Sequence, residues 1–486
     1  MAWEFTPGAR GLRQRCATSA LALAMVSAGS FSMQAQDLFE PAQFYVAGDH
    51  PVHIVIGAFN DDAFLDLVTV NEYASTVSVL QNEGEGYFGP PSTYPVGGGP
   101  QCADIGDLND DQLLDLVVSR TGGGGRISVL LGEGHGAFAP AVSYPCGPSP
   151  EGIALGDLNG DRLLDLAVAN WSADHVSVLL GNGDGTFGAP STYAAGSMPE
   201  AVAIGDFNGD QAPDLAAAVS NADRAAVLFG YGDGTFGPPM FYPVGDQPTC
   251  LVVADFNGDA APDLALGCHE DTGADDVAVL LNRGDGTFEP SVVYWIDSGS
   301  WSLAVGDFNL DRALDLVAAE LACDDVAVLP GVGDGTFEQH ENYLAGDGAR
   351  AVAVGDLDGD QVPDLAVANQ EGDDVAVLLG TTHPADVKGT RQPFASPRLL
   401  RVSPNPVAPS TMIEFDLPEP ARTRLLVFDA TGRAVGCILD QWRPAGTHRV
   451  PWERPRSSVT TIASGAYCLR LEARGRQSVQ AIAILR

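Results

Sequence analysis

The chain has 486 residues, enough for two or three domains, and its 57 glycines and 33 prolines are typical of short strands joined by tight turns. Charged residues make up only 18% of the sequence, which argues against a coiled coil or other long-helix protein. The 64 acidic residues outnumber 25 basic ones, and the net charge of −39 argues against a nucleic-acid partner or an anionic membrane surface.

The first 35 residues have the layout of a secretory signal peptide. Arg10, Arg13 and Arg15 precede an apolar stretch over residues 17–25, and small residues follow to about position 35. The apolar stretch is too short for a membrane span, and no later segment approaches 18 apolar residues. We therefore predict a secreted or cell-surface protein without a membrane span; the alternative for this segment is a short buried helix.

The charge changes sign along the chain. Residues 36–381 contain 7 Arg and no Lys against 55 Asp and Glu, whereas residues 396–486 contain 13 Arg against 7 acidic residues. Such a change marks a domain boundary. Residues 382–398 between these regions are rich in Thr, Pro and basic side chains without a hydrophobic period, which predicts a linker.

One acidic phrase, as in GDLNGDRLLDL and GDFNGDQAPDL, recurs seven times at spacings of 49 to 52 residues. Its leading positions are Ala58, Asp107, Asp157, Asp206, Asp255, Asp307 and Asp356. A second phrase, GDGTF or a variant, places a Phe at positions 88, 138, 187, 236, 288 and 337. Each unit has four short runs rich in Val, Ala, Leu and Tyr that are cut by turn residues. Seven such units predict an all-β, seven-bladed β-propeller over residues 36–381.

The spacing of the two phrases also predicts how the ring closes. From each of the six Phe residues to the next leading position there are 19 residues, and the seventh unit ends at Gly380 without a Phe. Phe39, near the mature N-terminus, precedes Ala58 by the same 19 residues. We therefore expect the N-terminal strand to complete the seventh blade.

The acidic phrase has the composition of a calcium loop. Carboxylates and an amide oxygen recur at its positions 1, 3, 5 and 9, and a backbone carbonyl at position 7 would add another oxygen. Hard oxygen ligands in this number suit Ca²⁺ better than Zn²⁺, and carboxylates this close repel one another without a cation. The glycine at position 4 and the flanking strands distinguish the loop from an EF-hand. The alternative is that Asp and Asn simply form turns here.

These repeats resemble the FG-GAP/VCBS family, the repeat of integrin alpha-subunit propellers and of many secreted bacterial proteins, over residues 37–381. The resemblance implies a seven-bladed propeller that binds about six or seven Ca²⁺ ions between the first and second strands of its blades. Six loops match the family's ligand positions: Asp107, Asn109, Asp111, Asp115; Asp157, Asn159, Asp161, Asp165; Asp206, Asn208, Asp210, Asp214; Asp255, Asn257, Asp259, Asp263; Asp307, Asn309, Asp311, Asp315; Asp356, Asp358, Asp360 and Asp364. The first loop has Ala58 in place of the leading Asp and retains only Asn60, Asp62 and Asp66, so we expect it to be the weakest.

Residues 399–486 show about seven runs of alternating hydrophobicity, which predicts an Ig-like β-sandwich. The order of its motifs, including RLLVFDATGRAV and SGAYCLRLEA, resembles the Ig-like domain of flagellar hook-capping proteins and the C-terminal sorting domain of type IX secretion cargo. That resemblance implies the outer-membrane secretion machinery as a partner. Trp452-Glu453 stands where that family more often has Trp-Asp-Gly, and the alternative is a sandwich without a sorting function. Cys437 and Cys468 are candidates for a disulfide within it.

The sequence contains no G-x-S-x-G, H-E-x-x-H, C-x-x-C or P-loop motif, and we do not predict an enzyme. The favoured function is a calcium-binding adhesion or ligand-binding module for an extracellular protein or glycan. The alternative is a lectin that binds polysaccharide, or an enzyme that degrades it, with exposed aromatic side chains against the sugar.

All variation in repeat length falls between the second and third strands, at residues 119–126 and 267–276. In an antiparallel blade these loops lie on the face opposite the calcium loops, and loops that vary on a rigid scaffold are where binding usually occurs. The predicted ligand-contacting residues are Arg120, Trp171, His175, His269, Glu270, Asp271, Trp295 and Trp301. The alternative is loop variation without function.

Overall fold

The computed structural model describes residues 38–60, 62–269 and 276–381, together with strand segments from residue 398 onward. The chain divides into two compact units between Ala385 and Asp386. The predicted signal peptide, the predicted linker up to residue 397, and Glu270, Asp271 and Trp452 lie outside the described residues. Among the residues that are described, no helix has the length and hydropathy that a membrane span requires.

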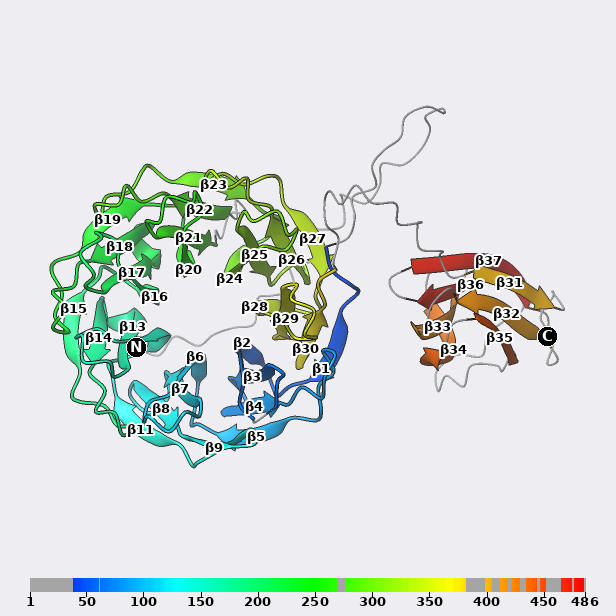
Figure 1. The fold of residues 1–486 in the computed structure, drawn as a ribbon, viewed down its shortest axis with the longest axis horizontal. Helices are drawn as coiled ribbons and strands as arrows, with labels where there is room; N and C mark the ends of the chain where they lie inside the picture. Colours follow the sequence, from blue (N-terminus) through cyan, green and yellow to red (C-terminus); the bar gives the residue numbers. More distant parts are fainter. Residues whose placement is uncertain are drawn as a thin grey trace, which may run out of the picture. The chain divides into compact units, whose positions relative to one another are not determined.

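The first unit consists of seven four-stranded antiparallel sheets arranged in a ring, with one strand of each sheet next to the central axis (Figure 1). The inner strands are β2 (Pro51–Gly57), β6 (Pro100–Gly106), β12 (Pro150–Gly156), β16 (Pro199–Gly205), β20 (Pro248–Ala254), β24 (Ser300–Gly306) and β28 (Ala349–Gly355). The second strands are β3 (Asp66–Asn71), β7 (Asp115–Arg120), β13 (Asp165–Asn170), β17 (Asp214–Val219), β21 (Asp263–Cys268), β25 (Asp315–Glu320) and β29 (Asp364–Asn369).

The third strands are β4 (Thr76–Leu80), β8 (Arg126–Leu130), β14 (His175–Leu179), β18 (Arg224–Leu228), β22 (Asp276–Leu280), β26 (Asp325–Leu329) and β30 (Asp374–Leu378). The outer strands are β5 (Ser92–Pro95), β11 (Val142–Pro145), β15 (Ser191–Ala194), β19 (Met240–Pro243), β23 (Val292–Trp295), β27 (Glu341–Leu344) and β1 (Gln43–Val46). The remaining elements of this unit are β9 (Gly132–Gly134), β10 (Ala137–Phe138) and the 3₁₀ helices η2 (Trp171–Ala173) and η3 (Ser220–Ala222). The predicted all-β propeller class is therefore confirmed for this unit.

The ring is closed by the N-terminal strand. Each inner strand contacts the inner strands of two neighbouring sheets, and β2 contacts both β6 and β28. β1 does not join the sheet of β2 but pairs with β30, so that Gln43 lies opposite Val377. Phe39 forms a β-bridge with Gly380, as Phe187 does with Gly181 in a sheet built from one continuous segment. The first strand in the sequence thus completes the last sheet, as the 19-residue spacing predicts.

Burial differs between the strands of each sheet, and the inner strands are only partly buried, as in β12. The second strands are buried along nearly their whole length, as in β13, because both of their faces pack against neighbouring sheets. This environment favours continuous runs of small and branched apolar residues such as DLAVAN, in place of simple alternation. The outer strands leave most of their side chains exposed, as in β15. The core of this unit therefore lies between adjacent sheets.

The Phe of each GDGTF turn packs against the neighbouring sheet. Phe236 is 7% exposed, and its ring meets that of Tyr193 from β15 edge to face at 5.3 Å between centroids. The Tyr193 hydroxyl donates to the carbonyl of Gly234 in the same turn at 3.2 Å. Gly234 has a φ of 79°, in the left-handed region that favours glycine. The GDGTF phrase therefore encodes a contact between sheets.

The second unit has seven described strands: β31 (Arg398–Ser403), β32 (Met412–Leu417), β33 (Ala421–Phe428), β34 (Ala434–Arg443), β35 (Gly446–Pro451), β36 (Gly465–Ala473) and β37 (Arg476–Ile484). They form one sheet in the order β31-β32-β35 and another in the order β34-β33-β36-β37. Side chains from both sheets, such as Phe415 and Leu425, share one apolar core. The Ig-like assignment of this two-sheet unit stays a prediction.

The candidate disulfide between Cys437 and Cys468 is wrong. Cys437 lies on β34 and Cys468 on β36, and β33 runs between these two strands. Strands separated by an intervening strand lie about 9 to 10 Å apart. A disulfide requires its two Cα atoms to lie within about 7 Å.

Candidate functional site

The acidic phrase forms the loop between the first and second strands of each sheet, and its side-chain oxygens fold inward. In the loop that joins β12 to β13, Asp157 accepts backbone N–H groups of Gly160 at 2.7 Å, Asp161 at 3.1 Å and Arg162 at 2.8 Å. The side-chain oxygen of Asn159 accepts the N–H of Asp161 at 2.8 Å. This turn gathers the oxygens of positions 1, 3 and 5 on the inner side of the loop.

The aspartate at position 9 is bonded differently. Asp165 is fully buried, and its two carboxylate oxygens accept the N–H groups of Leu158 at 3.0 Å and Gly181 at 2.8 Å. Burial raises the pKa of this carboxyl, and the two backbone hydrogen bonds oppose that rise. Each oxygen keeps a second lone pair that a metal ion can use. The position-9 aspartates are thus structural as well as candidate ligands, a role that the sequence pattern does not reveal.

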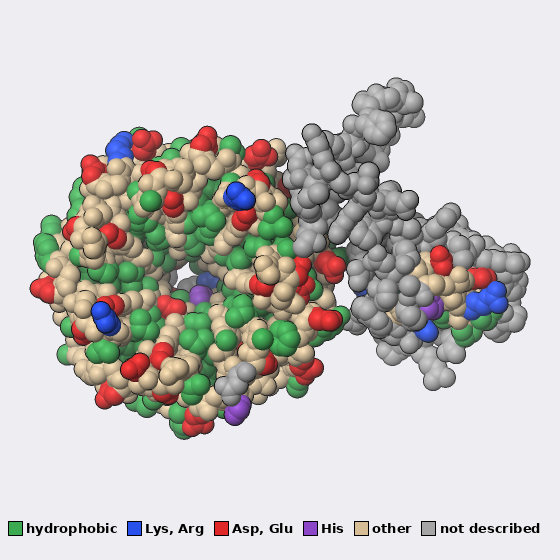
Figure 2. Space-filling model, viewed as in Figure 1, with side chains coloured by type: hydrophobic (Ala, Val, Ile, Leu, Met, Phe, Trp, Pro, Cys, Tyr) green, Lys and Arg blue, Asp and Glu red, His purple; other side chains and the backbone are tan. Residues whose placement is uncertain are grey.

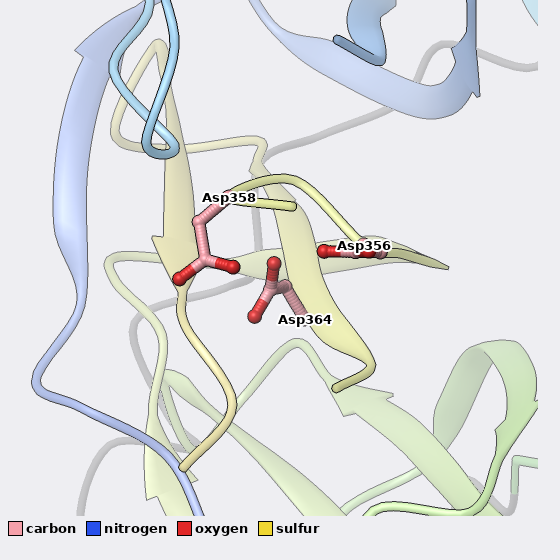
Figure 3. A group of neighbouring side chains, drawn as sticks. All are labelled: Asp356, Asp358 and Asp364. Carbon is pink, nitrogen blue, oxygen red and sulfur yellow. The ribbon is translucent and has the colours of Figure 1, made fainter. Parts of the chain in front are cut away.

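In the seventh loop, three carboxylates converge (Figure 3). Oxygens of Asp356, Asp358 and Asp364 all lie within 4.8 Å of one another. The pKa of Asp364 rises to about 7, chiefly through burial and further through the negative charges of Asp358 and Asp360. An all-oxygen donor set that includes three carboxylates is the chemistry that Ca²⁺ prefers, so the residues present fit this ion.

The first loop offers fewer oxygens. Asn60 donates its side-chain N–H to Asp66 at 3.4 Å, and Asp62 accepts the N–H of Phe64 at 2.8 Å. The methyl group of Ala58 supplies no oxygen where the other loops have an aspartate. The loop therefore keeps the turn and lacks the position-1 ligand, and its expected weakness stays a prediction.

The predicted ligand-contacting residues that are described lie at the opposite ends of the strands. Arg120 ends β7, His175 begins β14 and Trp295 ends β23. Trp171 begins η2, and Trp301 is the second residue of β24. Because the strands alternate in direction, these positions share one face, and the acidic loops lie on the other. The face assignment is confirmed, and the two insertions lie between β7 and β8 and between β21 and β22; ligand binding there stays a prediction.

On this face the structure brings together residues that the sequence pattern does not single out. The second residue of six of the seven inner strands is partly exposed at the centre of the ring, which is hollow in Figure 2. We call these residues the channel ring: Gln101, Glu151, Glu200, Thr249, Trp301 and Arg350. The corresponding Val52 is buried in the core between sheets. The guanidinium carbon of Arg350 lies 3.7 Å from the centroid of the Trp301 ring. His269 contacts the same indole, with 5.3 Å between ring centroids.

The channel ring is charged and partly buried. Burial lowers the pKa of Arg350 to about 10, and the negative charges of Glu151, Glu200 and Glu72 oppose this decrease. Burial also raises the pKa of Glu151 to about 7, with a further rise from the charge of Glu200. The pKa of Glu200 is raised by burial, while hydrogen bonding from Ser220 and Trp171 lowers it. Of the predicted ligand-contacting residues, Trp171, His269 and Trp301 therefore belong to one polar and aromatic cluster.

A sequence signal for this cluster exists in the inner strands themselves. The segments PEGIALG, PEAVAIG and ARAVAVG each place one charged residue at the second position of an otherwise small and apolar strand. A charge in such a strand costs free energy unless it faces a polar space. The repeat alignment would have placed these charges at one level of the channel.

The family model of the FG-GAP-like repeat matches six overlapping stretches of the chain: residues 59–118, 107–168, 157–217, 206–266, 255–318 and 307–367. Each stretch runs from the acidic loop of one sheet into the corresponding strands of the next. No curated protein matches the chain.

The solved structures that are similar to this chain are distant from it in sequence. A functionally unknown protein from Desulfotomaculum acetoxidans is 14% identical over 62% of this chain and 90% of its own, with a TM-score of 0.43. A virginiamycin B lyase from Staphylococcus aureus, in a catalytically inactive form with quinupristin, is 13% identical over 69% of this chain and 98% of its own, with a TM-score of 0.46. Similarity at this level carries no inference about function.

Proposed function

Because this chain belongs to the family of FG-GAP-like repeat proteins, we propose that it is a secreted or cell-surface, seven-bladed β-propeller that acts as a calcium-binding adhesion or ligand-binding module. The acidic loops hold Ca²⁺ on one face, and the opposite face contacts an extracellular protein or glycan. The observation that carries the proposal is the convergence of Asp356, Asp358 and Asp364.

In this proposal calcium is a structural brace. The side chains at positions 1, 3, 5 and 9 hold the ion in six loops, and the first loop contributes Asn60, Asp62 and Asp66. When bound, the ion neutralises carboxylates that otherwise repel one another. Extracellular calcium modules bind with dissociation constants of roughly 10⁻⁴–10⁻³ M, so each site adds on the order of 1 kcal/mol at millimolar calcium.

Thermal melting of the mature chain in millimolar calcium and in excess chelator tests this brace. We expect the midpoint to be several degrees lower in chelator, because six weak sites together contribute several kcal/mol, and we expect magnesium to restore little of it. Asp161→Asn should reduce the calcium effect, whereas Asp184→Asn, in an exposed GDGTF turn, should leave it unchanged. Ala58→Asp should add bound calcium. Equal midpoints in calcium and chelator would exclude the calcium proposal.

A polysaccharide ligand is the second candidate, and the surroundings of Trp171 favour it. This indole is 36% exposed, and it lies beside the carboxylate of Glu200 at the mouth of the channel. An aromatic face next to a carboxylate is a common arrangement for holding a sugar ring and its hydroxyl groups. Incubation of the protein with polysaccharides, followed by analysis of chain length, would separate a lectin from a degrading enzyme.

We also propose that the second unit addresses the protein to an outer-membrane secretion machinery. The two-sheet arrangement of β31 to β37 supports this proposal because the sorting domains that the sequence resembles are sandwiches. Deletion of residues 399–486 should retain the protein inside the producing cell. Unchanged appearance of the truncated protein in the medium would contradict a sorting role.

A further inference from the structure

The channel ring contains two charged groups that form no hydrogen bond or ion pair with any residue that the structure describes. The guanidinium of Arg350 is stacked on Trp301, and no hydrogen bond or ion pair joins it to another residue that the structure describes. The same holds for the carboxylate of Glu151 within the described part of the chain. Each group senses the charge of the other, but they do not form an ion pair. The Arg350 guanidinium, a donor, and the Glu151 carboxylate, an acceptor, therefore face the same channel without a hydrogen bond between them.

The neighbouring carboxylates of Glu72 and Glu200 contact other polar side chains. Glu72 accepts the side-chain N–H of Gln101 at 3.1 Å and lies 3.5 Å from His50. Glu200 lies close to Ser220 and Trp171, which lower its pKa. These contacts fix the acidic side chains in position while Arg350 and Glu151 remain available. The mouth of the channel is thus a preformed polar site with an aromatic wall.

The balance of charges selects the class of ligand. Three carboxylates face one guanidinium, within a propeller that has no lysine between residues 36 and 381, so an anionic ligand is repelled. A cationic ligand would be attracted by the carboxylates, but it could not accept a hydrogen bond from Arg350. Neutral hydroxyl groups avoid both conflicts, because each can donate to a carboxylate and accept from a guanidinium.

We propose that the mouth of the channel binds a neutral sugar unit of an extracellular glycan. Its hydroxyl groups donate to Glu151 and Glu200 and accept from Arg350, and the exposed indole of Trp171 packs against its ring. This inference rests on the ligand-binding function proposed above and specifies its ligand class and its residues.

A glycan array that contains neutral, uronate-bearing and amino-sugar oligosaccharides tests the inference with the full mature chain in calcium. We expect the protein to bind neutral glycans on the array. Titration calorimetry with the neutral oligosaccharide that binds best then measures the affinity. Arg350→Gln and Glu151→Gln should each weaken binding at least tenfold, because each removes a charge-assisted hydrogen bond. Arg224→Gln is the matched control, since Arg224 also stacks on an aromatic ring, that of Phe241 on an outer strand. Melting curves verify that all variants fold.

The outcomes separate this inference from the function on which it rests. Preference for uronate-bearing or amino-sugar glycans, or neutral binding that Arg350→Gln and Glu151→Gln leave intact, would overturn the inference and keep a ligand-binding propeller. If no glycan binds while the protein still adheres to a cell surface in calcium, the sugar assignment is wrong and the adhesion function stands. Absence of both kinds of binding would overturn both.

Discussion

The position-9 aspartates stabilise each sheet through backbone hydrogen bonds that do not depend on a bound ion. Asp214 is fully buried, and its two oxygens accept the N–H groups of Phe207 at 2.9 Å and Gly230 at 2.8 Å. These bonds join the acidic loop to the segment that follows the third strand. Asp210, four residues earlier, is exposed and bonds only within its own loop. Two aspartates of one phrase therefore differ in what they stabilise.

This difference predicts separate responses to calcium. Asp214→Ala should lower the free energy of unfolding by about 1–3 kcal/mol even in chelator, because two buried N–H groups lose their acceptor. Asp210→Ala should be nearly neutral in chelator and should reduce the stabilisation by calcium. Urea unfolding of both variants, with and without calcium, measures these effects. An equal loss of unfolding free energy in the two variants in chelator would contradict the structural role of Asp214.

A second residue-scale feature is the buried pair of Glu320 and Asp325 at the end of β25 and the start of β26. Glu320 is fully buried, and its Oε2 atom and Oδ1 of Asp325 have no hydrogen-bond partner unless a proton lies between the two carboxyls. Burial first, and then the nearby Asp325, raise the pKa of Glu320 to about 9. The negative charge of Asp297 raises the pKa of both carboxyls further, whereas His340 lowers the pKa of Asp325. The pair therefore keeps a proton at neutral pH.

The raised pKa gives folding a dependence on pH. Glu320 binds its proton more tightly in the folded state, so its stabilisation is full below its unfolded pKa, about 4.3, and is lost as the pH rises through about 9. Glu320→Gln should flatten the decline of the melting midpoint between these values, because the amide stays neutral. The exposed Glu338→Gln is the control and should retain the parent profile. A profile unchanged by Glu320→Gln would refute the shared proton.

At the scale of elements, the GDGTF turn connects adjacent sheets. The turn of the fourth sheet carries Phe236, which packs against Tyr193 of the third sheet. The N–H of Gly234 in that turn donates to the carbonyl of Leu158, in the third acidic loop, at 3.0 Å. The turn thus touches both the outer strand and the acidic loop of its neighbour. This is why the two phrases keep constant lengths while the loops on the opposite face vary.

Truncation of the turn's aromatic ring tests this connection. Phe236→Ala should lower the free energy of unfolding by about 3–5 kcal/mol through the cavity between two sheets. Tyr193→Phe should cost only about 1 kcal/mol, since it removes one hydrogen bond and keeps the ring. Tyr231→Ala, in the same turn but 67% exposed, is the control for chemical denaturation. A cost for Phe236→Ala no larger than that for Tyr231→Ala would show that the contact is not structural.

At the scale of the whole molecule, the ring depends on pairing the two ends of the repeat region. β1 supplies the outer strand of the sheet that β28, β29 and β30 begin. Phe39 packs edge to face against Phe308 at 5.5 Å and Tyr343 at 5.1 Å. The closing segment thus repeats the contacts that each GDGTF turn makes elsewhere.

Deletion of residues 36–46 from the mature chain should lower the melting midpoint more than any substitution above. The deletion exposes the edge of β30 and removes the aromatic contacts of Phe39, and an exposed strand edge favours association between chains. Phe44→Ser, at a position of β1 that is 54% exposed, keeps the strand and is the control. Calorimetry and size-exclusion chromatography provide the measurements. A monomeric deletion variant with the parent's midpoint would contradict closure by β1.

The sequence by itself determined the features that repeat locally. The acidic phrase, the GDGTF turn and their constant separation lie within about 50 residues and specify the strands, the inward-folded oxygens of loops such as that of Asp157, and the place of Phe39 in the last sheet. The strands and loops depend on neighbours in the chain, and the place of Phe39 follows from the repeat spacing although its partner Gly380 is distant in the sequence. The variation in loop length likewise identified the face that carries Trp171 and Trp301.

Only the tertiary structure decided which side chains from different repeats meet. Arg350 and Glu151 are 199 positions apart, and nothing in either segment specifies the other. They face one channel because closure of the ring brings all inner strands to a common axis. The double role of Asp165 and the shared proton of Glu320 also depend on the tertiary structure, because their burial is a property of the packed sheets even though their nearest partners lie in the same repeat.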